Sequence, residues 1–234
     1  MNVVKKVAVD VGFGRVKALA DTGREISFPA AVGEYRPLKF AAGEEEALAV
    51  GYRGRNWWVG EAALEQATTR QTVDRARTVG EEGMTLLAAA LAQVAEKDHE
   101  LVNLVIGLPV KFYENMKTRY AEMARDVHKI DILSPASLPA TSRRVVIVDQ
   151  VKVLPQPIGT LYNELLDDKG QIVNKDLAAG KIGIIDIGFN TLDLARTNRL
   201  TFINPQSDSF SGLGMFKAYQ ELAAGLYRRL EIEL

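Results

Sequence analysis

Two stretches of the chain share one pattern: VAVDVGFGRVKAL over residues 7–19 and IGIIDIGFNTLDLA over residues 182–195. Each begins with a run of apolar residues, continues with an aspartate, one apolar residue and Gly-Phe, and ends in a second apolar run. Short apolar runs on either side of a glycine turn are typical of a β-hairpin. We therefore expect two hairpins of the same design, one close to each end of the chain.

Each hairpin places a carboxylate at the end of its first strand, beside the glycine turn. Asp10 precedes Gly12 and Gly14, and Asp186 precedes Gly188. Glycine lets the backbone approach an anion closely, and the N–H groups of such a turn can hold phosphate oxygens. Phosphate repels an aspartate, so an aspartate fits beside the turn when a divalent cation lies between them. The repeated pattern predicts a phosphate site with a metal ion.

The bulk composition is that of an ordinary globular protein. The 234 residues allow one large domain or two modest ones, and the formal net charge of −1 gives no whole-chain argument for nucleic-acid binding. The absence of cysteine excludes disulfides and thiolate metal sites. The longest apolar run, residues 101–110, is about half of a membrane span. We expect a cytoplasmic protein that contacts neither nucleic acid nor membrane directly.

The order of predicted elements indicates a duplicated α/β protein whose second copy is incomplete. A looser stretch over residues 29–80 predicts an inserted small subdomain, because Trp57 and Trp58 need a core that buries them. The remaining pattern predicts strands over residues 3–9, 15–19, 25–28, 53–59, 101–108, 144–153 and 200–203, and helices over residues 81–97, 112–127, 157–168 and 212–230.

These motifs resemble those of the actin, Hsp70 and sugar-kinase superfamily, and within it the ParM/Alp plasmid-segregation proteins and their archaeal actin-like relatives. Residues 10–17 stand where the family has its first phosphate loop, and residues 186–193 where it has its second. Residues 156–162 (QPIGTLY) resemble the linking helix called connect 1, and residues 106–109 (IGLP) resemble a strand end common in ParM-like sequences. The resemblance implies an α/β fold of the actin-like, RNase H-like ATPase type.

The resemblance also implies a domain plan. Domain I would span residues 1–155, with the inserted subdomain at about 29–80, the linking helix would span 156–169, and the first part of domain II would span 180–234. In the family, domain II continues past its final helix to a glycine-rich adenosine loop, and no such loop follows Leu213. We therefore expect a fragment or a shortened relative, with domain I complete, domain II truncated and a poor affinity for ATP.

The ligands implied by the family are ATP or ADP and Mg²⁺. Asp10 and Asp186 would hold the hydrated Mg²⁺, and Gln156 would position the attacking water. Such contacts fit phosphoryl transfer, which depends mostly on positioning and charge neutralisation. The β-phosphate would be contacted by Gly12, Phe13, Gly14 and Lys17, and the γ-phosphate side by Gly188, Phe189, Asn190 and Thr191.

The function implied by the family is that of an ATP-dependent filament. The chain would associate with itself, hydrolyse ATP to destabilise the polymer, and serve a prokaryotic cytoskeleton or plasmid and DNA segregation through a separate DNA-bound adaptor protein. Two alternatives stay open. One is a small-molecule kinase of the same superfamily, for which Asp149 is the candidate catalytic residue. The other is a partner-binding module that hydrolyses nothing.

Three further residues are interpreted without a catalytic role. Asp193 is placed at an outward-facing strand position, where it would be structural. His99 and His128 lie far apart in the sequence with no metal-ligand spacing, and both are expected at the surface.

Overall fold

The structure is a computed structural model that describes residues 4–37, 47–67, 78–134, 137–167 and 169–230. The chain divides into two compact units. The first comprises Met1–Ile106 and Met116–Val153, and the second comprises Gly107–Asn115 and Leu154–Leu234. The division at residue 155 that the sequence suggested stays a prediction. In the described part of the chain, no helix combines the length and the apolar character that a membrane span requires.

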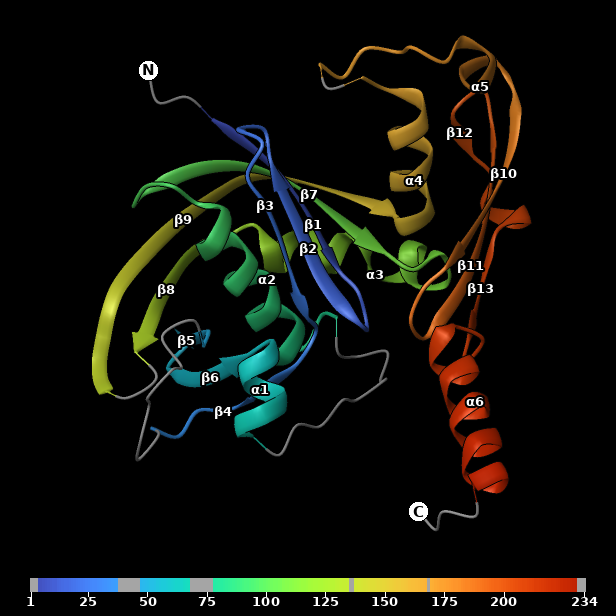
Figure 1. Ribbon diagram of the computed structural model, residues 1–234. Coiled ribbons are helices and arrows are strands. Elements are labelled where there is room, and N and C mark those ends of the chain that lie inside the picture. The colour runs from blue at the N-terminus through green and yellow to red at the C-terminus, as the bar shows by residue number, and fades with distance from the viewer. Residues whose placement is uncertain (1–3, 38–46, 68–77, 135–136, 168, 231–234) are drawn as a thin grey trace. The chain divides into compact units, whose positions relative to one another are not determined.

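The first unit is built on a nine-stranded mixed sheet in the order β3-β2-β1-β7-β9-β8-β5-β6-β4 (Figure 1). β1 and β7 run parallel, whereas β2 and β3 pair antiparallel to their neighbours. The strands are β1 (Lys5–Val11), β2 (Arg15–Ala20), β3 (Glu25–Pro29), β4 (Val32–Glu34), β5 (Ala49–Tyr52), β6 (Arg55–Val59), β7 (Glu100–Leu108), β8 (Val127–Ser134) and β9 (Ser137–Pro155), and the helices are α1 (Glu61–Gln66), α2 (Glu81–Val94) and α3 (Val110–Ala124). The start of α3, up to Asn115, belongs to the second unit.

Buried and exposed side chains alternate along the two strands of the first hairpin. Val7, Val9 and Val11 of β1 are buried on one face, together with Val16 of β2. α2 contacts β1, β2 and β3, and almost every residue of this helix is buried (Figure 1). Because neighbours along a strand point to opposite faces, Asp10 lies on the other face of the sheet from these valines. The strands predicted over residues 3–9, 15–19 and 25–28 are confirmed, and they form an antiparallel meander.

Residues of the predicted insertion form a small core together with Leu133 of β8. Trp58 has no solvent exposure and its ring lies 4.6 Å from that of Tyr35, measured between centroids. Ala62 and Ala63 of α1 pack into the same cluster. The expected burial of the two tryptophans is confirmed, because Trp57 is also buried.

The sequence missed β8 and placed the end of α3 too late. α3 ends at Ala124, and Val127, which was assigned to the helix, begins β8. β8 pairs with both β5 and β9, so its conformation is fixed by residues distant in the chain. This pairing extends the predicted strand at 144–153 to β9, Ser137–Pro155.

The second unit contains a four-stranded antiparallel sheet in the order β10-β11-β12, with β13 also paired to β11. α4 packs on β10 and β11, and Ile158 and Leu161 of this helix form a buried cluster with Ile184, Ala195 and Val110. The elements are α4 (Gln156–Leu165), α5 (Lys175–Ala179), β10 (Lys181–Ile187), β11 (Thr191–Asn198), β12 (Thr201–Phe202), a 3₁₀ turn (Asn204–Gln206), β13 (Asp208–Ser211) and α6 (Met215–Leu230).

Candidate functional site: two matched glycine turns

The first glycine turn joins β1 to β2. Val11 lies opposite Val16 in the ladder, and the N–H of Gly12 donates to the carbonyl oxygen of Arg15 over 3.1 Å. A Cβ at Gly12 would lie 2.8 Å from that same oxygen. Only glycine therefore fits this position without a shift of the turn.

This turn has the backbone groups that an anion site requires. Among the described residues, no backbone carbonyl accepts a hydrogen bond from the N–H of Phe13 or Gly14. The carbonyl oxygen of Gly14 is engaged, because it accepts from the N–H of Ala30 over 3.0 Å. Successive N–H groups with no backbone acceptor can form a concave site for an anion.

Asp10 and Lys17 lie directly opposite each other across the β1–β2 ladder. Opposite residues in an antiparallel pair project from the same face, so one carboxylate and one ammonium group flank the turn. Asp10 is half-buried and Lys17 is exposed. The guanidinium of Arg15 is held on β3 instead, where it donates to the hydroxyl of Ser27 over 2.9 Å.

The second glycine turn, between β10 and β11, repeats this geometry. Ile187 lies opposite Leu192, and the N–H of Gly188 donates to the carbonyl oxygen of Thr191 over 2.9 Å. Asp186 is the residue before Ile187, just as Asp10 precedes Val11 in the first turn. Both predicted hairpins are therefore present, with the same register and the same turn bond.

The residue opposite the aspartate differs in charge between the two hairpins. Lys17 of the first hairpin corresponds to Asp193 of the second, which lies opposite Asp186. Asp193 is 2% exposed, so the expected outward-facing position is wrong. Its Oδ1 accepts hydrogen bonds from the N–H of Val110 over 3.0 Å and from the hydroxyl of Ser209. Asp193 thereby ties β11 to the first turn of α3 and has the expected structural role.

The side chains of Asn190 and Thr191 are buried, with 6% and 5% exposure. What the second turn presents to solvent is therefore mainly backbone. Among the described residues, no backbone carbonyl accepts from the N–H of Phe189 or Asn190. The roles proposed for these residues toward phosphate stay predictions.

Gly214 is a part of this site that the sequence reading did not single out. A Cβ there would lie 2.4 Å from the carbonyl oxygen of Phe189 and 2.6 Å from that of Gly188. The same two carbonyls accept hydrogen bonds from the first N–H groups of α6, those of Phe216 and Met215. The glycine pair at 212 and 214, just before a helical pattern, was the available signal for a close approach.

Gln156 is the first residue of α4, after Pro155 and before Pro157. The helix packs on the face of the sheet that carries Ile184. Asp186 lies two residues further along β10 and therefore projects from that same face. Gln156 and Asp186 thus belong to one unit, to a helix and to the sheet face that it covers.

The two residues predicted to bind a metal ion, Asp10 and Asp186, both offer carboxylate oxygens. Within the described ranges, no three side chains of His, Asp or Glu gather into a group that could hold a metal ion. Asp10 and Asp186 are each half-buried at a strand end beside a turn. Carboxylate oxygens are hard ligands, and Mg²⁺ is commonly held by a carboxylate with water in several of its other positions.

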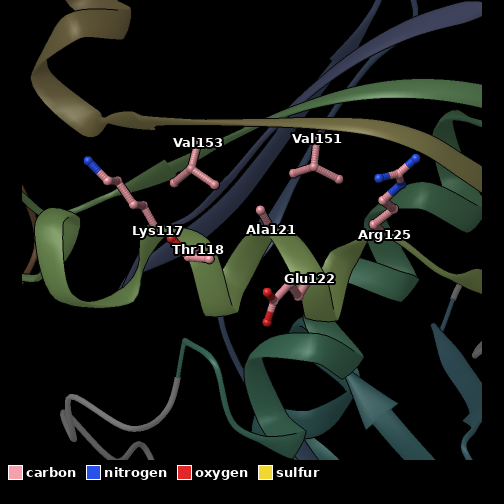
Figure 2. Close-up of a pocket in the computed structure, with 7 residues that line it drawn as sticks. All are labelled: Lys117, Thr118, Ala121, Glu122, Arg125, Val151 and Val153. Carbon is pink, nitrogen blue, oxygen red and sulfur yellow. The ribbon is translucent and has the colours of Figure 1, made fainter.

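A groove of about 410 Å³ lies in the first unit, and none of the predicted site residues lines it (Figure 2). Its walls come from α3, including Thr118 and Ala121, and from Val151 and Val153 of β9. The charged groups at its margin have both signs. The groove therefore carries no signature of a phosphate site.

His128 is buried, so its expected surface position is wrong. Its Nε2 lies 2.9 Å from the carbonyl oxygen of Ala124, and its Nδ1 lies 2.8 Å from the hydroxyl of Tyr52. Because a carbonyl only accepts, Nε2 carries the proton and the tyrosine hydroxyl donates to Nδ1. Burial lowers the pKa of His128. His99 is exposed, as expected.

Comparisons with known proteins identify the family to which the two hairpins and their sheets belong. The family model for the N-terminal domain of actin-like proteins matches residues 8–159. The chain belongs to this family. No curated protein sequence gives a significant match. The predicted α/β actin-like fold is thereby confirmed.

Solved structures of actin-like proteins share this fold. A 15-stranded ParM filament from Clostridium botulinum is 21% identical, with a TM-score of 0.76, 99% of this chain covered and 70% of that one. An archaeal actin homolog is 21% identical, with a TM-score of 0.73, 98% of this chain covered and 68% of that one. Bacillus thuringiensis ParM with AMPPNP is 19% identical, with a TM-score of 0.70, 97% of this chain covered and 65% of that one.

Proposed function

We propose that this actin-like chain binds ATP or ADP with Mg²⁺, hydrolyses ATP, and associates with itself into a filament. The observation that carries the proposal is the matched register of the two hairpins. Each sets an aspartate two residues before a glycine whose N–H closes the turn, at Gly12 and at Gly188. Membership of the actin-like family and likeness in fold to a ParM filament and to a ParM with AMPPNP support it.

The phosphates would be bound mainly by backbone. The N–H groups of Phe13 and Gly14 in one turn, and of Phe189 and Asn190 in the other, have no backbone acceptor among the described residues and could donate to phosphate oxygens. Lys17, opposite Asp10, adds a positive charge that would reduce the repulsion between that aspartate and a phosphate. The remaining turn residues, Gly12, Gly188 and Thr191, would shape the backbone.

Asp10 and Asp186 would hold the hydrated Mg²⁺. When bound, the ion would neutralise charge on the phosphates as the phosphoryl group leaves. Gln156 would orient the attacking water through its amide, since a glutamine has no titratable group and cannot serve as a general base. We further propose a cytoplasmic location, a role in a prokaryotic cytoskeleton or in plasmid and DNA segregation, and contact with DNA only through an adaptor protein.

Calorimetry with ATP and Mg²⁺, followed by light scattering over a range of protein concentrations, tests this function. Saturable binding and a scattering rise that needs both ATP and a threshold protein concentration are expected. Phosphorylation of an added small-molecule acceptor without any rise in scattering would replace the filament with a kinase, for which Asp149 is the candidate. Absence of nucleotide binding by a folded chain would leave a partner-binding module.

A further inference from the structure

The first turn of α6 holds the second glycine turn by its carbonyl groups. The N–H of Met215 donates to the carbonyl oxygen of Gly188 over 3.0 Å. The N–H of Phe216 donates to the carbonyl oxygen of Phe189 over 2.8 Å, and the rings of these two phenylalanines lie 5.4 Å apart between centroids. Figure 1 shows α6 beginning at the end of the sheet where β10 passes into β11. Two backbone hydrogen bonds and one ring contact therefore join the helix to the turn.

These hydrogen bonds also fix the direction of the next N–H groups along the turn. In a planar trans peptide, the C=O of one residue and the N–H of the next point in opposite directions. The bond that fixes the carbonyl of Gly188 therefore directs the N–H of Phe189 away from α6. The bond that fixes the carbonyl of Phe189 directs the N–H of Asn190 in the same way. These are the two N–H groups of this turn for which the described residues supply no backbone acceptor.

The first glycine turn does not have this support. Its residues Gly12 and Phe13 match Gly188 and Phe189 of the second turn. In the part of the chain that the structure describes, no backbone N–H donates to the carbonyl oxygens of Gly12 and Phe13. The reason lies in the segments that follow each hairpin, because the chain that leaves β3 continues into β4, whereas the chain that leaves β13 enters α6. Support by a helix is therefore particular to the second turn.

We propose that Met215 and Phe216, the first two residues of α6, are positioning residues for phosphate binding. They hold the second turn so that the N–H groups of Phe189 and Asn190 face the terminal phosphate of ATP before the nucleotide binds. The ligand is that of the proposed function, on which this inference rests. Donors that are fixed in advance lose less conformational freedom when the ligand binds, so the phosphate is held more tightly.

Met215→Pro removes one of these hydrogen bonds and keeps the helix. Met215 is the first residue of α6, where a proline fits because the N–H at that position has no acceptor within the helix. Met215→Ala keeps the N–H and is the matched comparison at the same position. Lys175→Pro places a proline at the first residue of α5 and is the control for the substitution itself. Circular dichroism should show that all three variants are folded.

Nuclear magnetic resonance relaxation of the nucleotide-free chain tests the positioning directly. In the unchanged chain and in Lys175→Pro, the backbone amides of Phe189 and Asn190 should have order parameters of about 0.85, the value of a rigid backbone. In Met215→Pro these order parameters should fall toward about 0.6, whereas those of Phe13 and Gly14 should not change. Order parameters of Phe189 and Asn190 that are the same in Met215→Pro and in the unchanged chain would overturn the proposal.

Calorimetry with a non-hydrolysable ATP analogue and with ADP tests the consequence for phosphate binding. Relative to Met215→Ala, Met215→Pro should bind the analogue about tenfold more weakly, the scale of one hydrogen bond to a charged group. ADP lacks the terminal phosphate, so its affinity should change far less. An equal loss for both nucleotides would indicate a general structural defect and would overturn the positioning role.

Two further outcomes are distinguishable. If Met215→Pro does not fold, Gly214→Ala takes its place in both measurements, because its methyl group would push away the same two carbonyl oxygens. If the unchanged chain binds no nucleotide, the proposed function fails, and the relaxation measurement still decides whether α6 fixes the N–H groups of Phe189 and Asn190.

Discussion

The Oδ1 atom of Asp193 accepts a hydrogen bond from the backbone N–H of Val110, 3.0 Å away and 83 residues earlier in the chain. Val110 begins α3, so the carboxylate binds the N-terminal end of a helix, where N–H groups have no partner within the helix. Ser209 completes the contact: its hydroxyl donates to Asp193 and its Oγ accepts from the N–H of Lys111 over 3.0 Å. This cap fixes the start of α3 to the strands that carry the second turn.

Asp193→Ala should lower the free energy of unfolding of the second unit by about 1–3 kcal/mol, because the buried N–H of Val110 and hydroxyl of Ser209 lose their acceptor. Asp193→Asn keeps one oxygen acceptor and should lose less. Both tryptophans lie in the first unit, so urea unfolding should be followed by far-ultraviolet circular dichroism. Glu221→Ala, on the exposed surface of α6, is the control. Equal stability of Asp193→Ala and this control would exclude a capping role.

Asp186→Ala should abolish Mg²⁺-dependent ATP hydrolysis, with a loss of about 100-fold or more, the scale for removing one charge-stabilising group. Phosphate release measured against Mg²⁺ concentration reports the effect. The control is Asp176→Ala, which removes an exposed carboxylate of α5 in the same unit. Hydrolysis that survives in Asp186→Ala with an unchanged dependence on Mg²⁺ would remove Asp186 from the metal site.

Gln156→Ala should slow hydrolysis by roughly 10- to 100-fold and leave nucleotide binding nearly intact. Poorer positioning of the attacking water lowers the rate of the chemical step but does not change the affinity for nucleotide. Calorimetry measures the affinity and single-turnover hydrolysis measures the rate. Gln171→Ala, an exposed glutamine of the same unit, should change neither. A parallel loss of binding and rate in Gln156→Ala would assign Gln156 to ligand binding.

The sequence predicted both hairpins because their signals are local. An alternation of apolar residues, a glycine turn and a second apolar run lie within about a dozen residues, and the strands β1 to β3 and β10 to β11 formed as expected. The strand β8 was missed for the opposite reason. Its residues include His128 and Asp131, and only pairing with β5 and β9 makes it a strand.

In the candidate site, too, the features that depend on local sequence were predicted and those that depend on distant residues were not. The positions of Asp10 and Asp186 follow from the spacing of their own hairpins, whereas the burial of Asp193 depends on Val110 and Ser209, which no local pattern reveals. The burial of His128 likewise depends on Tyr52, 76 residues away. β13 is only four residues long and polar at three of them, so nothing within Asp208–Ser211 indicated a strand.

Gly214→Ala should destabilise the second unit by about 1–3 kcal/mol, because its new methyl group would overlap the carbonyl oxygens of Phe189 and Gly188. Gly225→Ala is the matched control within α6, where a Cβ meets nothing within 4 Å. Alanine in that helix should stabilise by about 0.5–1 kcal/mol. Urea unfolding followed by circular dichroism compares the two variants, and equal stability of Gly214→Ala and Gly225→Ala would show that the turn has room for a methyl group at residue 214.

The stability of the first unit should depend on pH through His128. Burial lowers the pKa of this imidazole below its ordinary value of 6.5, so the unfolded chain binds a proton more readily than the folded one. The free energy of unfolding should therefore be flat above pH 6.5 and should fall as the pH drops from 6.5 toward the lowered pKa, by at most about 1.4 kcal/mol per pH unit. Fluorescence of the buried Trp57 and Trp58 during urea unfolding measures the free energy of unfolding at each pH.

His128→Gln should remove the part of the pH dependence that His128 causes, and His99→Gln, at an exposed position, should keep it. A slope that is identical in the unchanged chain and in His128→Gln would show that other groups cause it.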